Sequence, residues 1–305
     1  MNNMFFSCES LVSVPELDTS KVTNMKNMFM FCRNLESVSL SDTSNVTDMS
    51  YMFTTCKSLT SVPELNTSNV TNMENMFGGC AMTTVPLYDT SKVTNMSNMF
   101  SMCANITTVP KIDVSSAENM MYMFNKCTNL ESVSDFSIPN ATNLQGMFWE
   151  CTNLESVSLS DTSNVTNMSS MFRDCANLKT VGEIDMSNVT NNSSMFLYCT
   201  NLTNLTLKNI KIALQVGSGS TYGHNLTVDS LVGLCKECIK QSSNKTLTMG
   251  STNKAKLADV YVKFTDSSAT SIATGEKGEV EICESTDDGA MTIREYMTLK
   301  SWTIA

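Results

Sequence analysis

Histidine, basic residues and long apolar runs are scarce in this chain of 305 residues. A single histidine, 20 Lys plus Arg and 30 Asp plus Glu give a formal net charge of −10. One imidazole leaves little material for His-based catalytic triads or histidine-rich metal sites. The negative charge repels phosphate backbones and anionic membranes, and no apolar run reaches the roughly 18 residues of a membrane span. We therefore expect neither nucleic-acid binding nor membrane insertion.

The motifs of the common enzyme classes are missing as well. The sequence contains no Gly-x-Ser-x-Gly, no P-loop and no His-Glu-x-x-His, which would mark a nucleophile elbow, a phosphate site or a zinc site. Asp287-Asp288-Gly289 indicates a turn rather than a calcium loop, and nothing indicates the cleft that a pair of glycosidase carboxylates would need. We predict a protein that is not an enzyme and carries no cofactor or metal.

One segment of fixed length recurs through two thirds of the chain. A Met-Phe pair returns every 24 residues with one interval of 23, and a Cys follows three residues after each Phe. A coil of this length cannot bury its own apolar face, so a fixed period of about 20 to 30 residues predicts a solenoid of stacked coils. The repeated phenylalanines are Phe5, Phe29, Phe53, Phe77, Phe100, Phe124, Phe148, Phe172 and Phe196.

Within a coil, the apolar positions follow neither a helical nor a strand period. From Val46 to Val62 they are spaced mostly by three residues, which indicates short strands and tight turns. The run Leu-x-Ser-Val predicts the main strand, and Asp-Thr-Ser predicts a turn held by side chains. The segment Met-x-x-Met-Phe-x-x-Cys predicts one tight helical turn of 3₁₀ type.

Two further predictions concern the end of the strand and the Asn before the first Met. After the strand Val, the next inward apolar residue lies two places on in some coils and three in others, as in Val157–Leu159 against Val181–Ile184. We expect the strand to end where proline follows the Val, because proline lacks an N–H. The Asn before the first Met of each coil, such as Asn24, predicts a side-chain hydrogen-bond ladder between coils. The prolines that follow the strand Val are Pro15, Pro63, Pro86 and Pro110.

The segment Thr162–Val181, TSNVTNMSSMFRDCANLKTV, resembles the BspA-type leucine-rich repeats, in particular a branch of short bacterial repeats with an SxVTxMxxMF signature. The resemblance covers residues 1 to about 207. It implies a leucine-rich-repeat-like right-handed solenoid with parallel strands on one face. It also implies a bacterial or protozoan surface protein that adheres to host proteins or other cells, without shared catalytic residues.

We predict two domains: a solenoid of about nine repeats over residues 1–207, and a small α+β module over 208–305 that caps it. In the module we expect one or two strands within 205–216, a linker or loop over 217–223 and a helix over 226–241 with Asp229 or Thr227 near its start. A strand and then a helix from Ser251 or Thr252, a strand over 279–284 and a short helix from Met291 follow. Cys235-x-x-Cys238 is either half of a zinc site, which Cys283 and His224 could complete, or part of an apolar helix face, which we favour.

The repeat cysteines predict a ladder of buried free thiols. Stacked coils bring Cα atoms within disulfide range, but side chains in register point the same way, which opposes the dihedral angle of about 90°. A ladder of metal-bound thiolates would place unpaired charges in a dry core. We therefore expect the cysteines to pack as small apolar side chains with free thiols. The ladder comprises Cys32, Cys56, Cys80, Cys103, Cys127, Cys151 and Cys175.

Variation between coils concentrates near the Met-Phe pair. Six residues there are large or charged where other coils carry small or polar residues: Phe31, Tyr51, Tyr122, Trp149, Arg173 and Tyr198. A row of exposed aromatics suits a sugar or a protein surface. The alternative is that each side chain fills a local gap or packs on the next coil.

Three functions fit these observations. The first is adhesion or binding by a secreted or cell-surface protein, with a host or bacterial surface protein or a glycan as partner. The second is a structural or receptor-binding part of a gut bacteriophage virion, because segments of residues 246–259 and 291–305 resemble modules in repeat proteins of gut bacteria and their prophages. The third is a passive spacer. The chain opens in mid-coil without a cap, so we expect lost upstream repeats or self-association through this coil.

Overall fold

The computed structural model of the chain describes residues 1–61, 64–84, 87–109, 112–216, 226–239, 245–248, 251–258, 261–264, 280–283, 291–293, 297 and 302–304. Several features interpreted above lie outside these residues: Pro63, Pro86, Pro110, residues 217–223, His224 and Asp287–Gly289, together with the side chains of Cys238 and Cys283.

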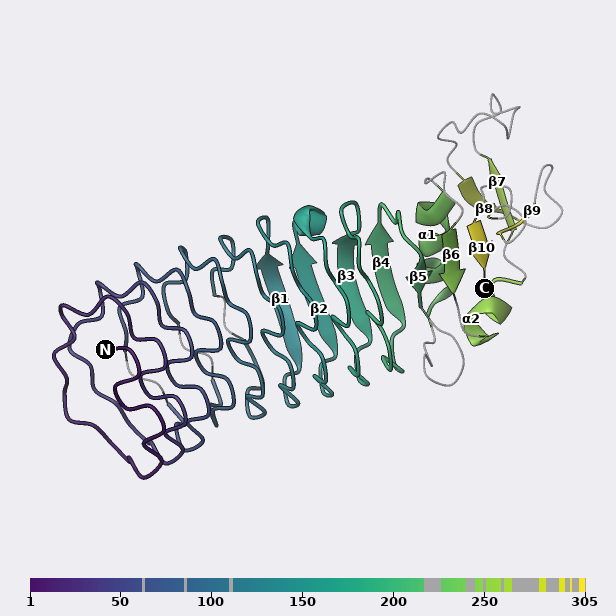
Figure 1. Cartoon of the computed structure of the whole chain (residues 1–305). Coiled ribbons are helices and arrows are strands. Elements are labelled where there is room, and N and C mark those ends of the chain that lie inside the picture. The colour runs from purple at the N-terminus through teal and green to yellow at the C-terminus, as the bar shows by residue number, and fades with distance from the viewer. Residues whose placement is uncertain are drawn as a thin grey trace.

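Stacked coils make up the chain from the N-terminus to β4 (Figure 1). Four strands lie side by side in one parallel sheet in the order β1-β2-β3-β4. Paired residues are 24 positions apart, as in Ser132 and Ser156, so each coil adds one strand. The strands are β1 (Ser132–Ser137), β2 (Ser156–Ser160), β3 (Thr180–Asp185) and β4 (Asn204–Lys208).

The main strand begins later than predicted. In β1 to β3 it starts at the Ser or Thr before the strand Val and not at the preceding Leu, and it continues past Val. β4 starts in the same way at Asn204, where Leu205 replaces the Val. In the first coils, described pairing here is limited to isolated bridges such as Ser13–Ser37 and Leu17–Leu40, on either side of Pro15. The described pairing is therefore interrupted at Pro15, in line with its missing N–H.

The two spacings of the inward residue are reconciled by β-bulges. Phe136 lies three residues after Val133, yet it pairs with Leu159, which lies two residues after Val157. A second register shift between β3 and β4 brings Ile184 opposite Leu207. An extra residue in one strand is the definition of a bulge. Both kinds of coil thus keep their apolar side chains in the core.

A second parallel ladder joins the coils at the Asn before the first Met, and here the predicted side-chain ladder is largely wrong. Backbone bridges connect Asn24, Asp48 and the later equivalents to Asn191. Asn24 makes the predicted bond, because its Nδ2 donates to Asp48 Oδ2 in the next coil at 3.2 Å. Its side-chain oxygen accepts the N–H of Lys26 at 2.9 Å, and this second bond is the one that recurs in later coils. This is an Asx turn, so the side chain shapes its own coil while the backbone joins neighbouring coils.

The Met-Phe segment is a run of tight turns rather than one 3₁₀ turn. From Met25 to Phe31, alternate residues donate their N–H to carbonyls of the next coil at 2.8–3.0 Å, and the N–H groups of Met28 and Met30 donate three positions back. Asn27 and Phe31 have φ of 56° and 65°, and equivalent residues of the other coils are also positive. Left-handed residues break a regular helix, while their N–H groups bond the next coil.

The Asp-Thr-Ser turn is confirmed. The Asp42 carboxylate accepts the N–H of Ser44 at 2.8 Å, and this bond lowers the pKa of Asp42. The Thr between them is buried, and its hydroxyl donates to a carbonyl of the next coil, as in Thr43 to Asn66 at 2.9 Å. The 3₁₀ element η1 (Thr162–Asn164) lies at this turn.

Stacked phenylalanines run along the core of the coils. Neighbouring rings from Phe5 to Phe196 lie 5.3–5.8 Å apart between centroids and are parallel within 10°. The Met, Val, Leu and Cys repeat positions around them are buried. Such rings contribute area burial and about 0.5–1.5 kcal/mol per pair beyond it. Each coil therefore gains its core mainly from its neighbours.

Beyond β4 the period ends and the expected helices appear. The elements are β5 (Leu214–Gln215), α1 (Val228–Ile239), β6 (Lys245–Thr248), α2 (Ser251–Lys256) and β10 (Trp302–Ile304). β10, β6 and β5 form one parallel sheet. The strand β10 was not predicted.

A separate antiparallel sheet has the order β8-β7-β9, formed by β7 (Tyr261–Phe264), β8 (Val280–Cys283) and β9 (Met291–Thr292). β8 was expected. β7 and β9 correct the prediction, which read residues after Ser251 and from Met291 as helical.

Helix α1 covers the open edge of β4 (Figure 1). The Thr227 N–H donates to the Thr203 carbonyl at 2.8 Å, and the Ser230 hydroxyl accepts the N–H of Leu205 at 3.2 Å. Thr227 also caps the helix through the Ser230 N–H, as its place in the sequence suggested. The edge groups of the last strand are thus partly satisfied by α1. The division into residues 1–207 and 208–305 stays a prediction.

None of the helices described here has the length and apolar character that crossing a bilayer requires.

Candidate binding surface

The six predicted binding residues all lie in the turns around the Met-Phe pair. Tyr51 and Tyr122 occupy the left-handed position two residues before Phe, and Phe31 and Tyr198 occupy the left-handed position two residues after it. Trp149 and Arg173 directly follow their Phe. This position in the turn directs the side chains away from the core stack, and all six retain exposure.

Three of the six come together. The Trp149 ring lies 6.0 Å from the Tyr122 ring, tilted by 43°, and the Arg173 guanidinium carbon lies 5.1 Å above Trp149. Asp174 holds both, because its Oδ2 accepts the Trp149 Nε1–H at 3.0 Å and the Arg173 Nε–H at 3.2 Å. We call Tyr122, Trp149, Arg173 and Asp174 the aromatic cluster. It spans three successive coils.

Neighbouring residues fix the position of Tyr122. Its hydroxyl accepts a hydrogen bond from Gln145 Nε2 at 2.9 Å. The side-chain oxygen Oε1 of Gln145 in turn accepts a hydrogen bond from Asn167 Nδ2 at 3.1 Å. Gly146 lies under the ring: a Cβ there would approach Tyr122 Cε1 to 2.1 Å, and the φ of Gly146 is +58°. Glycine thus meets both a steric and a conformational demand.

Replacing Gly146 with Ala is expected to destabilise the protein by about 1–3 kcal/mol, because the methyl group displaces Tyr122 and alanine disfavours a positive φ. Denaturant unfolding measures the loss. In a Trp302→Phe background, where Trp149 is the remaining indole, we also expect a changed fluorescence maximum.

Gly182→Ala is the matched control for Gly146→Ala. A Cβ on Gly182 would meet its nearest atoms at 3.5 Å, which is ordinary contact. Equal stability loss in the two variants, with unchanged fluorescence in both, would contradict the proposed packing of Tyr122 on Gly146.

The other three predicted residues lie in separate local contacts. Phe31 packs edge-on against Phe6 at 5.8 Å. The Tyr51 ring lies 5.5 Å beneath the Lys26 ammonium, and its hydroxyl donates to the Glu74 carboxylate at 2.5 Å. Burial is the main cause that raises the pKa of Tyr51 to about 12, and the Glu74 carboxylate is the second. Tyr198 is 39% exposed. For Phe31 and Tyr51, packing on an adjacent coil is the observed arrangement.

The repeat cysteines lie in the core. Cys32, Cys56, Cys80, Cys103, Cys127, Cys151, Cys175 and Cys199 are buried and free. Each thiol points to the Phe carbonyl of the preceding coil, as in Cys127 to Phe100 at 3.1 Å. Burial raises the pKa of Cys56 and of Cys103 to about 12. These thiols are therefore protonated donors at neutral pH.

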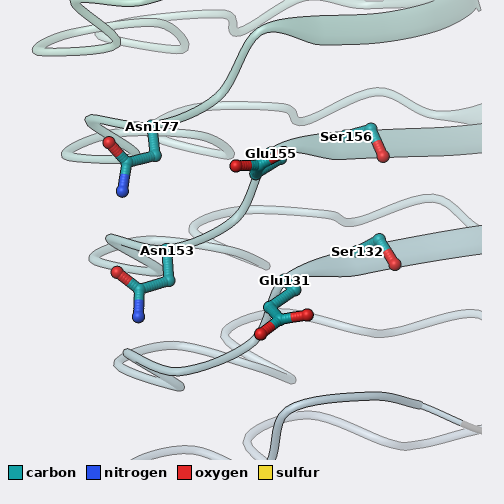
Figure 2. Close-up of a pocket in the computed structure, with 6 residues that line it drawn as sticks. All are labelled: Glu131, Ser132, Asn153, Glu155, Ser156 and Asn177. Carbon is teal, nitrogen blue, oxygen red and sulfur yellow. The ribbon is translucent and has the colours of Figure 1, made fainter.

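A second surface, which the sequence analysis missed, is a hollow where strands β1 and β2 begin. Its volume is about 460 Å³. We call it the polar groove; Figure 2 shows its lining residues, which come from three successive coils. They are Glu131, Ser132, Asn153, Glu155, Ser156 and Asn177.

The signal for the polar groove was present in the sequence. Asn-Leu-Glu-Ser stands at residues 129–132 and again in the next coil at 153–156; it also occurs at 34–37, but the coils on either side of that one lack the full set. The predicted binding residues were chosen for their variation near the Met-Phe pair, and these positions lie outside that segment. Two adjacent coils with the same polar set form the hollow.

Metal binding has no support in the part of the chain that the structure describes, where no group of three or more His, Cys, Asp or Glu side chains is placed to hold an ion. Cys235 is buried on α1 with Leu231 and Leu234, which matches the apolar helix face.

The stacked coils and their parallel ladders define a repeat protein. A family model described as "Mycoplasma protein of unknown function, DUF285" matches residues 1–87, 80–175 and 118–217. The chain belongs to this family, whose matches cover the coils and β4.

Among solved structures, the chain is similar to a leucine-rich cell surface protein from Faecalibacterium prausnitzii A2-165. The two are 23% identical, the match covers 72% of this chain and 70% of the other, and the TM-score is 0.36. No curated protein matches the chain.

Proposed function

We propose that this is a non-catalytic protein of the cell surface or extracellular space that binds a protein or glycan partner through the aromatic cluster. Its coils would form a right-handed, leucine-rich-repeat-like solenoid of the BspA type, as the SxVTxMxxMF pattern suggests. The observation that supports binding is the convergence of Tyr122, Trp149 and Arg173 from three coils at positions that vary between coils.

The chemistry of the aromatic cluster suits recognition. Trp, Tyr and Arg are the residues most enriched at binding hot spots, and an aromatic face also stacks on the apolar face of a sugar ring. Hydrogen bonds from Trp149 and Arg173 to Asp174 hold the side chains in one arrangement. Less side-chain freedom then remains to be lost on binding.

Replacing Trp149 with Ala is expected to weaken binding at least about 30-fold, which corresponds to a hot-spot loss of about 2 kcal/mol. The loss follows because Trp149 contacts all of the other members of the aromatic cluster, Tyr122, Arg173 and Asp174. Binding of the purified chain to a glycan array and to cultured epithelial cells measures the effect.

Phe6→Ala serves as the control for Trp149→Ala, since Phe6 is a 46% exposed aromatic in the first coil, away from the cluster. Circular dichroism of both variants separates lost binding from lost folding. If folded Trp149→Ala and Tyr122→Ala proteins bind as the parent does, the cluster is a packing feature, and the passive-spacer function gains support.

A further inference from the structure

We propose that the polar groove is a second, independent site that binds a neutral, extended oligosaccharide laid across β1 and β2. This goes beyond the function proposed for the aromatic cluster, because it adds a different surface and names the ligand as an uncharged polyhydroxylated chain.

The groove repeats one set of polar groups in adjacent coils. Ser132 pairs with Ser156 in the parallel ladder, and the Glu155 N–H donates to the Glu131 carbonyl at 2.8 Å. Equivalent groups are therefore spaced by roughly the 4.8 Å that separates parallel strands. A ligand that crosses the strands meets the same chemistry twice, which favours a chain of repeating units.

Several groups in the groove retain hydrogen-bonding capacity. Asn153 donates Nδ2 to Asn129 at 3.4 Å, which leaves its Oδ1 as an acceptor. Asn177 accepts from Asn201 on Oδ1 at 3.5 Å, which leaves its Nδ2 as a donor. The two amides thus differ in the group that they offer. Figure 2 shows them side by side at one end of the groove.

The serine hydroxyls and one carboxylate complete the set. Ser132 and Ser156 alternate with inward Val residues, and Ser156 is exposed. Glu155 is bridged by Lys179 at 2.8 Å, whereas the ion pairs found among the described residues do not include Glu131. Donors and acceptors are therefore mixed, as a sugar hydroxyl requires, because a hydroxyl both donates and accepts.

The lining also argues against other ligand classes. Glu131 and Glu155 repel phosphate, sulfate and uronate groups, and the lining set contains no aliphatic or aromatic side chain to hold an apolar ligand. Sites for small molecules have volumes of about 300–1,000 Å³, and the groove lies within this range. A short segment of a neutral glycan satisfies these conditions.

The test titrates the intact chain with cellohexaose, maltohexaose and chitohexaose, followed by isothermal calorimetry. We expect at least one neutral hexasaccharide to bind, and Asn177→Ala to weaken it at least tenfold by removing the donor. Glu131→Gln retains an acceptor oxygen and is expected to lose less. Asn105→Ala is the matched control, because Asn105 holds the same repeat position in a coil outside the groove.

The outcomes separate the two sites. Hexasaccharide binding that survives Trp149→Ala and fails in Asn177→Ala supports the polar groove, whatever the result for the aromatic cluster. Absence of binding up to about 10 mM, or equal binding by Asn177→Ala and the parent, overturns the proposal. A calcium titration that gives heat in the parent and none in Glu131→Gln, with no sugar response, would also overturn it in favour of a cation.

Discussion

Alkaline solution is expected to unfold this protein well below the pH at which an ordinary domain loses its structure. Burial raises the pKa of Cys32 to about 11 and those of Cys56 and Cys103 to about 12, while an unfolded thiol titrates near about 8.5. Between these values the unfolded chain releases protons that the folded chain retains. The free energy of unfolding therefore falls as pH rises.

The size of the alkaline effect comes from the number of thiols. Each one contributes a loss of about 1.4 kcal/mol for every pH unit between its unfolded and folded pKa. Eight repeat thiols are buried, the seven predicted for the ladder and Cys199. Since domains are stable by about 5–15 kcal/mol, we expect unfolding within about one to two pH units above the pKa of an unfolded thiol. Below about pH 8 this loss is absent.

Urea titrations at a series of pH values between neutral and strongly alkaline measure this dependence under reducing conditions. Cys8 is exposed, so Cys8→Ser should leave the profile unchanged. Cys127→Ala removes one buried thiol and should reduce the slope. A free energy of unfolding that stays constant through about two pH units above the pKa of an unfolded thiol would contradict a ladder of buried, protonated thiols.

Truncating one ring of the phenylalanine stack is expected to be the most damaging single substitution in the coils. Phe124 is fully buried, and its ring lies 5.7 Å from both Phe100 and Phe148. Phe124→Ala should cost about 3–5 kcal/mol, the range for Phe truncation in a core. The reason is structural as well: the ring joins two coils, and a repeat array depends on the interfaces between neighbours.

Chemical unfolding of Phe124→Ala against the parent measures this loss. Met102→Ala is the control, because Met102 lies in the same region and is 57% exposed; its stability should stay within about 0.5 kcal/mol of the parent. Separate transitions for the two halves of the stack would show that the cavity also breaks cooperativity between coils. A loss below about 1 kcal/mol would mean that the stack relaxes around the cavity.

Features that depend on one coil alone could be predicted from the sequence. The period of 24 residues identified which side chains face the core, because each coil must bury the same face against its neighbours. The Asp-Thr-Ser turn follows from local chemistry, since the Asp42 carboxylate reaches the Ser44 N–H two residues on. Helix α1 was similarly marked by its apolar positions and by Thr227 at its start.

Features that depend on contact between coils required the tertiary structure. The Asn before the first Met was correctly predicted to join coils, but only the structure showed that at Asn95 the side-chain oxygen accepts a bond within its own turn while the backbone bridges the neighbouring coils. The bulge at β1 likewise depends on the pairing partner, Leu159, and not on the strand itself.

The two surfaces show the same division. The sequence by itself determined that residues near the Met-Phe pair vary and that Trp149 belongs among them. The tertiary structure decided that Trp149 meets Tyr122 and Arg173, whereas Tyr51 packs with Lys26 and Glu74. The physical reason is that core positions obey one shared constraint in every coil. Whether surface side chains about 24 residues apart touch depends instead on how long each side chain is and in which direction it points.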